Sequence, residues 1–217
     1  MIHLNLIQKI VVWAIPVLFA ITMHEVAHGW AARRLGDPTA QMLGRLSFNP
    51  IKHVDPVGTI LVPALMLILG GFLFGWAKPV PVTARNFKNP RRDMALVALA
   101  GPLANLAMAI IWALVVRFSV SINAPWLSVP LILMGQAGVL INVILLVVNL
   151  LPLPPLDGGR VLTGIIPPRM AATVDRIEPF GFIIIVVLLV TGVLNVILSP
   201  PIAAMRLTLL LHVGGLS

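Results

Sequence analysis

The chain has 217 residues, of which 59% are hydrophobic and 10% charged, with a mean hydropathy of +1.03 and a formal net charge of +8. A water-soluble domain of this size cannot bury so much apolar surface, so we expect a single-domain integral membrane protein, 1–217. The basic residues lie between apolar stretches, which indicates lipid headgroup contacts and membrane topology and argues against nucleic acid as a partner. There are no cysteines, which excludes disulfides and thiolate metal ligands.

The first predicted helix runs from about Asn5 to Leu35 and contains His24-Glu25-Val26-Ala27-His28. Residues four apart lie on one face of a helix, so His24 and His28 can bind one zinc ion while Glu25 acts as general base on a water. No other charged residue occurs from 10 to 32. An ionisable group inside an apolar helix of membrane length indicates a functional site.

The loop that follows contains His53, two residues before Asp55. A loop histidine beside an aspartate is usually a surface residue, and a metal ligand is the alternative interpretation.

The next apolar segment, Val57–Trp76, has the length of a membrane span, but its proline and paired glycines also suit a re-entrant hairpin. If it spans, nine basic residues lie on one side of the membrane and six on the other. If it re-enters, twelve lie on one side, opposite Lys9, Arg117 and Arg206. The positive-inside rule favours the hairpin, with the basic side in the cytoplasm and the N-terminus outside.

The sequence Lys78-Pro79-Val80-Pro81-Val82 predicts a short extended strand. Proline has no N–H, so Lys78, Val80 and Val82 keep their donors along one edge. A peptide substrate can pair with that edge by strand addition, and a rigid proline-rich connector is the alternative.

Two further spans are predicted at 94–118 and 127–151, which gives an all-α polytopic membrane protein with about four full spans, the last crossing lying between Arg176 and Arg206. Both spans carry a stripe of small and polar residues that must face inward, because an amide in lipid needs a partner. The stripes comprise Gly101, Asn105 and Ala109, then Gly135, Gly138, Asn142 and Asn149. After Pro200-Pro201 we expect a short interfacial or sixth segment, Ile202–His212.

The third zinc ligand is predicted to be Asp157. The other acidic residues besides Glu25 lie in loops or beside basic residues, whereas Asp157 follows a proline-rich helix break and precedes two glycines that let it turn toward a metal. It reaches the histidines only if it leaves the membrane on their side, which again requires that Val57–Trp76 does not cross.

These residues resemble the site-2 protease family of intramembrane zinc metalloproteases. The three core motifs of that family are matched in order by His24–His28, Ala100-Gly101-Pro102-Leu103-Ala104-Asn105 and the segment from Asn149 to Gly158. The segments 53–58 and 75–82 resemble a compact bacterial and archaeal branch. The resemblance covers the chain from Asn5 to about Ser199, without room for the PDZ or CBS domain that many members carry.

The resemblance implies one zinc per chain on His24, His28 and Asp157, Glu25 as base, and Asn149 steadying the reacting peptide. We expect cleavage of transmembrane proteins or peptides in a prokaryotic cell membrane, near its cytoplasmic face, with Asn149 or Asn105 donating to the oxyanion. A membrane hydroxylase or desaturase would need about eight histidines for a di-iron site, and the chain has five. A zinc transporter or a catalytically silent scaffold is the non-enzyme alternative, although neither needs Glu25.

Overall fold

The computed structural model describes residues 5–61 and 78–216, and every regular element in these two ranges is a helix. Short 3₁₀ and π-helical turns are labelled η. In chain order the elements are α1 Leu6–Arg34, α2 Thr39–Met42, η1 Pro50–His53, η2 Pro56–Leu61, η3 Ala84–Asn86, α4 Pro90–Val120, α5 Pro125–Asn149, α6 Asp157–Ile165, α7 Pro168–Asp175, α8 Glu178–Val190, α9 Val193–Thr208 and η4 Leu209–Val213.

Four of these described helices are long and apolar enough to cross a membrane, in agreement with the predicted number of spans. Local signals set where they begin. The side chain of Asn5 accepts the N–H of Gln8 at 2.8 Å and Gln8 returns the contact, so α1 begins with a capping box. A proline begins both α4 and α5. The first N–H groups of a helix have no acceptor within the helix, so the missing N–H of proline costs no hydrogen bond there. The four helices are Ile7–Arg34, Pro90–Val120, Pro125–Asn149 and Val193–Val213.

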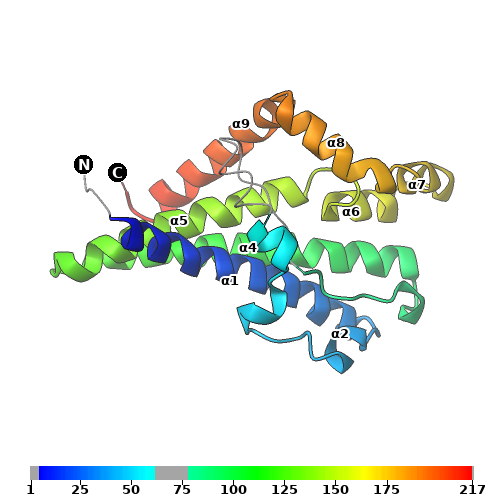
Figure 1. Ribbon diagram of the computed structural model, residues 1–217, viewed down its shortest axis with the longest axis horizontal. Coiled ribbons are helices and arrows are strands. Elements are labelled where there is room, and N and C mark those ends of the chain that lie inside the picture. Colours follow the sequence, from blue (N-terminus) through cyan, green and yellow to red (C-terminus); the bar gives the residue numbers. More distant parts are fainter. Residues whose placement is uncertain (1–4, 62–77, 217) are drawn as a thin grey trace.

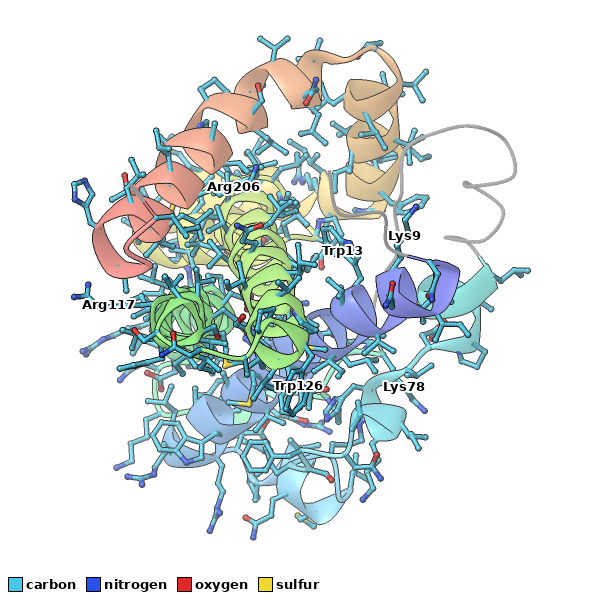
Figure 2. The ribbon with its side chains drawn as sticks, turned by 90° about the vertical axis from the view of Figure 1, so that its left-hand side faces the viewer. Lys9, Trp13, Lys78, Arg117, Trp126 and Arg206 are labelled. Carbon is cyan, nitrogen blue, oxygen red and sulfur yellow. The ribbon has the colours of Figure 1, made fainter. Side chains whose placement is uncertain are left out.

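The helices α1, α4 and α5 lie side by side and alternate in direction (Figure 1). The end of α1, the start of α4 and the end of α5 meet at one end of this bundle, which we call the basic end because Arg33, Arg34, Arg91 and Arg92 lie there. Figure 2 shows the opposite end, where Lys9, Arg117 and Arg206 lie. The end of α1 and the start of α4 therefore lie at the same end of the bundle (Figure 1), and which side of a membrane this end faces stays a prediction.

Two exposed tryptophans lie near the two ends of α1. Trp13 is 44% exposed and is visible in the end view of Figure 2, whereas Trp30 is 53% exposed and lies near the basic end. The guanidinium carbon of Arg34 lies 4.7 Å from the centroid of the Trp30 ring. This distance is within the range of a cation–π contact, which ties the last turn of α1 to the tryptophan before it.

Small residues let α4 and α5 approach each other closely. Gly135 and Gly138 of α5 pack against Val116 and Trp112 of α4, and a Cβ at either glycine would clash. Asn142 continues the same buried face of α5. The inward direction predicted for this stripe is therefore confirmed for these three α5 residues.

The helices α8 and α9 together lead from the basic end to the opposite end, with a bend between them (Figure 1). Gly192 forms this bend with a φ of +77°, a conformation that glycine adopts without strain. α9 continues through Pro200 and Pro201, and η4 extends it to Val213. The prediction of a separate short piece, Ile202–His212, is therefore wrong. In an apolar environment a full helix break would leave still more backbone groups without hydrogen bonds, which favours a helix that continues through the prolines.

The segment from Lys78 to Thr83 has no regular structure, so the predicted strand Lys78–Val82 is not formed. A strand needs a neighbour with which to form a ladder, and no strand occurs in the described parts of the chain. The N–H of Lys78 instead donates to the carbonyl of His53 at 3.0 Å. The predicted hairpin, Val57–Trp76, lies outside the described residues beyond Leu61.

Candidate metal centre

Three side chains from α1 and α6 meet near the basic end of the bundle. The Nε2 atoms of His24 and His28 lie 3.0 Å apart, one helical turn from each other on α1. Asp157, the first residue of α6, places its Oδ2 atom 3.2 Å from His24 Nε2 and 3.4 Å from His28 Nε2. Within the described ranges these residues form the group that could hold a metal ion. The structure thus brings together the three residues predicted as ligands.

The separations of these atoms suit a tetrahedral zinc site. Ligands bound to zinc at about 2.0–2.1 Å are about 3.3 Å apart at the tetrahedral angle. Asp157 Oδ2 is buried and has no hydrogen-bond partner among the described residues. A buried carboxylate oxygen without a donor is costly unless a cation compensates it. The three side chains therefore fit a bound zinc ion.

The hydrogen bonds behind the two imidazoles direct their lone pairs to the same point. His28 Nδ1 lies 2.8 Å from the carbonyl oxygen of Val97, and His24 Nδ1 lies 2.6 Å from Asn105 Oδ1. Both oxygens accept, so each imidazole carries its hydrogen on Nδ1 and leaves Nε2 free to bind a metal. Two lone pairs that face each other across 3.0 Å repel unless a cation lies between them.

Gly101 lets α4 pack against the metal-binding face of α1. A Cβ at this position would clash with the imidazole rings of both His24 and His28. Gly101, Asn105 and Ala109 are all buried, as the stripe predicted from the sequence requires. α4 is therefore the wall directly behind the two imidazoles.

A proline-rich turn returns the chain from α5 to the histidines and presents Asp157. Gly158 and Gly159 pack against backbone atoms of residues 150–154, where no side chain would fit. Gly181 of α8 lies against Pro154 with the same lack of space. These contacts fix the start of α6, which determines where the Asp157 carboxylate lies.

A cavity of about 180 Å³ lies beside the three ligand atoms, and Glu25 faces it. Glu25 Oε2 accepts the N–H of Val80 at 2.8 Å, so the carboxylate is linked to the irregular segment 78–83. Asn149 and Arg160 contribute further polar groups to the cavity lining. The remaining lining residues are Pro79, Val80, Val82, Val97, Ala98 and Pro155.

Charged side chains hold the segment 78–83 in place. Arg45 Nη2 donates to the carbonyl of Lys78 at 2.9 Å. Asp37 is completely buried and accepts four hydrogen bonds. Burial raises the pKa of Asp37, but these hydrogen bonds outweigh it and hold the pKa below its usual value. The donors are the N–H and hydroxyl of Thr39, the N–H of Thr83 and the side-chain amide of Asn86.

Of the two asparagines predicted to bind the substrate or the oxyanion, one lines the cavity and the other does not. Asn149 lines the cavity, with its Nδ2 atom donating to the carbonyl of Leu145 at 2.9 Å, and its role stays a prediction. Asn105 is completely buried behind His24 and its amide hydrogens go to Asn142 and Ala20, so the predicted donation from Asn105 to an oxyanion is wrong.

His53 is neither a surface residue nor part of the metal group. Its side chain is 1% exposed and its Nε2 atom lies 2.8 Å from the carbonyl oxygen of Ser47. The histidine therefore shapes the loop that precedes η2, and the surface interpretation from the sequence is wrong.

Two residues near the site were given no role in it by the sequence interpretation. Arg160 lies three residues after Asp157, so a helix that begins at Asp157 puts both on one face toward the cavity. Asn142 lies on the inward stripe of α5, where a buried amide needs a partner, and that partner is Asn105.

Comparison with known proteins places the chain in a family. The model of Peptidase family M50 matches residues 12–137 and 127–192. The protein named "Putative zinc metalloprotease YwhC" of Bacillus subtilis (strain 168) is 41% identical over 196 residues, 88% of this chain and 86% of that protein. "Putative zinc metalloprotease Rip2" of Mycolicibacterium smegmatis and of Mycobacterium tuberculosis (strain H37Rv) are 32% and 30% identical over 82% of this chain, which spans 66% of their length. No solved structure matches the chain. The chain therefore belongs to peptidase family M50, the site-2 protease family.

Proposed function

We propose that this protein is a zinc-dependent endopeptidase that hydrolyses peptide bonds of transmembrane substrates within the bilayer. The main support is the unpartnered Asp157 Oδ2 atom, which meets two imidazole nitrogens beside a cavity that Glu25 also lines. His24, His28 and Asp157 would hold one zinc ion per chain. A zinc ion bound there supplies a Lewis acid that lowers the pKa of a water and polarises a carbonyl.

Glu25 is the general base of this proposal. Its carboxylate would take the proton of the attacking water and pass it to the leaving amine. The hydrogen bond from the Val80 N–H to Oε2 holds the carboxylate in one orientation beside the cavity.

Asn149 would bind the backbone of the reacting peptide or the oxyanion. The amide nitrogen of Asn149 carries two hydrogens, and one of them is used by the Leu145 carbonyl. The second is available to a peptide in the cavity that Asn149 lines.

The segment 78–83 would bind an unwound substrate along its backbone, as we infer from its place in the cavity wall. The Lys78 N–H already has a partner in His53, so pairing would use Val80 and Val82. A substrate carbonyl that takes the Val80 N–H must displace Glu25 Oε2. Peptide binding and release of the base would then be coupled.

The basic end would face the cytoplasm of a prokaryotic cell, with the N-terminus outside, because twelve basic residues lie on the side of the site in this topology. Single cysteines test this orientation cleanly, since the chain has none. Lys52→Cys and Lys88→Cys should react with an impermeant thiol reagent from the same side and Lys9→Cys from the other. Labelling of Lys52→Cys and Lys88→Cys from opposite sides would contradict the topology.

The central experiment combines metal analysis with cleavage of a model transmembrane peptide. Glu25→Gln should retain zinc and lose cleavage, because glutamine keeps the shape but cannot accept a proton. Asp157→Ala should lose zinc and cleavage together. Full cleavage by Glu25→Gln would end the protease proposal. Zinc binding with no cleavage, together with zinc flux into vesicles, would support the transporter alternative.

A further inference from the structure

A chain of buried side-chain amides connects α5, α4 and α1 behind the metal centre. Asn142 Nδ2 donates to the carbonyl of Gly138 at 2.8 Å, and Asn142 Oδ1 accepts from Asn105 Nδ2 at 2.9 Å. Asn105 Nδ2 also donates to the carbonyl of Ala20 at 3.2 Å, and Asn105 Oδ1 lies 2.6 Å from His24 Nδ1. Asn105 and Asn142 are both 0% exposed, so no solvent replaces these bonds.

The direction of this chain is fixed by backbone carbonyls that can only accept. The Gly138 carbonyl requires the NH₂ of Asn142 to face it, which leaves Asn142 Oδ1 to face Asn105. Asn105 must then turn its NH₂ toward Asn142 Oδ1 and the Ala20 carbonyl. The only group that Asn105 can offer to His24 is its oxygen.

The reverse orientation of the Asn105 amide would prevent His24 from binding a metal through Nε2. With its NH₂ toward His24, the Asn105 amide would require a lone pair on Nδ1, and the neutral imidazole would then carry its hydrogen on Nε2. That hydrogen would point at His28 Nε2 and Asp157 Oδ2, where the metal would bind. The tautomer of His28 does not depend on a side-chain amide, because its Nδ1 donates to the backbone carbonyl of Val97.

We infer that Asn142, which does not touch the metal ligands, is a positioning residue that sets the tautomer of His24 through Asn105, together with the Ala20 carbonyl that holds the same Asn105 amide. The amides of α4 and α5 thereby control the metal affinity of a histidine on α1. This inference rests on the zinc site of the proposed function and does not depend on peptide cleavage.

The test is zinc affinity, measured by chelator competition on the purified full chain. Asn142→Thr and Asn142→Val have the same shape, but only the threonine hydroxyl can donate to Gly138 and accept from Asn105. Asn142→Thr should bind zinc within about threefold of the wild type, and Asn142→Val about tenfold more weakly, at the lower edge of the usual range for groups behind a ligand. Thr22→Val makes the same hydroxyl-to-methyl change at a buried position of α1 and should leave the affinity unchanged.

A second variant separates direction from packing. Asn105→Asp offers His24 an oxygen in either orientation, but it leaves Asn142 Oδ1 and the Ala20 carbonyl without a donor, so its own zinc affinity is the reference for the double variant. In the Asn105→Asp background, Asn142→Val should no longer weaken zinc binding. Equal affinities for Asn142→Thr and Asn142→Val, or an undiminished effect of Asn142→Val in that background, would overturn the inference. A wild-type chain that binds no zinc would instead overturn the metal site itself, and with it the proposed function.

Discussion

The two walls of the cavity are built in different ways. The helical wall consists of α1, α4 and the start of α6, whose peptide groups are bonded within the helices. Its ligands are therefore oriented by side-chain contacts and close packing, with Gly101 and the Asn105 amide behind the imidazoles. The opposite wall is the segment 78–83, whose backbone has no ladder of its own.

Charged and polar side chains replace the missing ladder in the second wall. Asp37, Arg45 and Glu25 bond to backbone groups of residues 78–83. The two walls of this cavity thus differ in what is held. In the helical wall, close packing and side-chain hydrogen bonds orient the metal ligands. In the segment 78–83, a few side-chain contacts hold the backbone groups, and a bound peptide could replace them. Metal affinity should depend on the first wall, and peptide binding and local stability on the second.

Among the residues that are neither ligands nor the proposed base, the largest effect is expected for Asn149→Ala, which sharpens the comparison because Asn149 lines the cavity from the end of α5. Turnover of a model peptide should fall by roughly 10²- to 10³-fold, the usual scale for one lost donor to an oxyanion, with zinc content unchanged. Ser119→Ala is the matched control, since Ser119 is a buried polar residue that bonds to its own helix. Parallel losses of zinc and of stability in Asn149→Ala would show that Asn149 is a packing residue.

Gly101→Ala should break the helical wall alone. The added Cβ displaces the imidazoles of His24 and His28, so zinc affinity should fall by about 10- to 100-fold in chelator competition. Ala107→Val adds two carbon atoms on the exposed face of the same helix and should leave the affinity unchanged. Wild-type affinity in Gly101→Ala would mean that α1 and α4 can separate without cost to the site.

Asp37→Asn should break the second wall alone, with zinc affinity preserved. Asparagine cannot accept all four hydrogen bonds, so the free energy of unfolding should fall by about 1–3 kcal/mol at pH 7. The measurement is thermal unfolding of the metal-free protein, with the exposed Asp175→Asn as control.

The same pair of proteins gives a pH dependence. The pKa of Asp37 is lowered in the folded chain, so its stabilisation is complete above the unfolded value of about 3.9 and is lost as the pH falls through the folded value. The difference between the wild type and Asp37→Asn should therefore shrink below about pH 4. A difference that is as large at pH 3 as at pH 7 would contradict the role of the Asp37 charge.

The ligands could be predicted because membrane helices restrict where charge occurs. The four-residue spacing of His24 and His28 fixes a shared face, and Asp157 stands at a helix break with glycines on one side. The apolar lengths likewise predict the helices around the site. Periodicity does not say which way an amide on the inward face points, so it cannot distinguish a donor to the oxyanion from an amide behind His24, which is where Asn105 lies.

The predictions of a strand at Lys78–Val82 and of a helix break at Pro200-Pro201 are both wrong, and both rested on prolines. Pro79 and Pro81 fit a strand edge, and Pro200-Pro201 fit a helix break, but both outcomes depend on partners that the local sequence does not contain. The first segment lacks a neighbouring strand in the described ranges, and α9 continues through both prolines as part of an apolar helix of membrane length. Gly192, a residue with no proline beside it, makes the bend instead.

The tryptophans of α1 have a consequence for the depth of the metal centre. Tryptophan favours the boundary between membrane and water, and the 17 residues from Trp13 to Trp30 correspond to about 26 Å of helix, close to the roughly 30 Å of a bilayer's hydrocarbon core. On this scale His24 and His28 lie about 9 Å and 3 Å below the level of Trp30. Under the proposed function, a peptide bond held at this centre would lie within two helical turns of the level of Trp30, so water would have only a short way to enter.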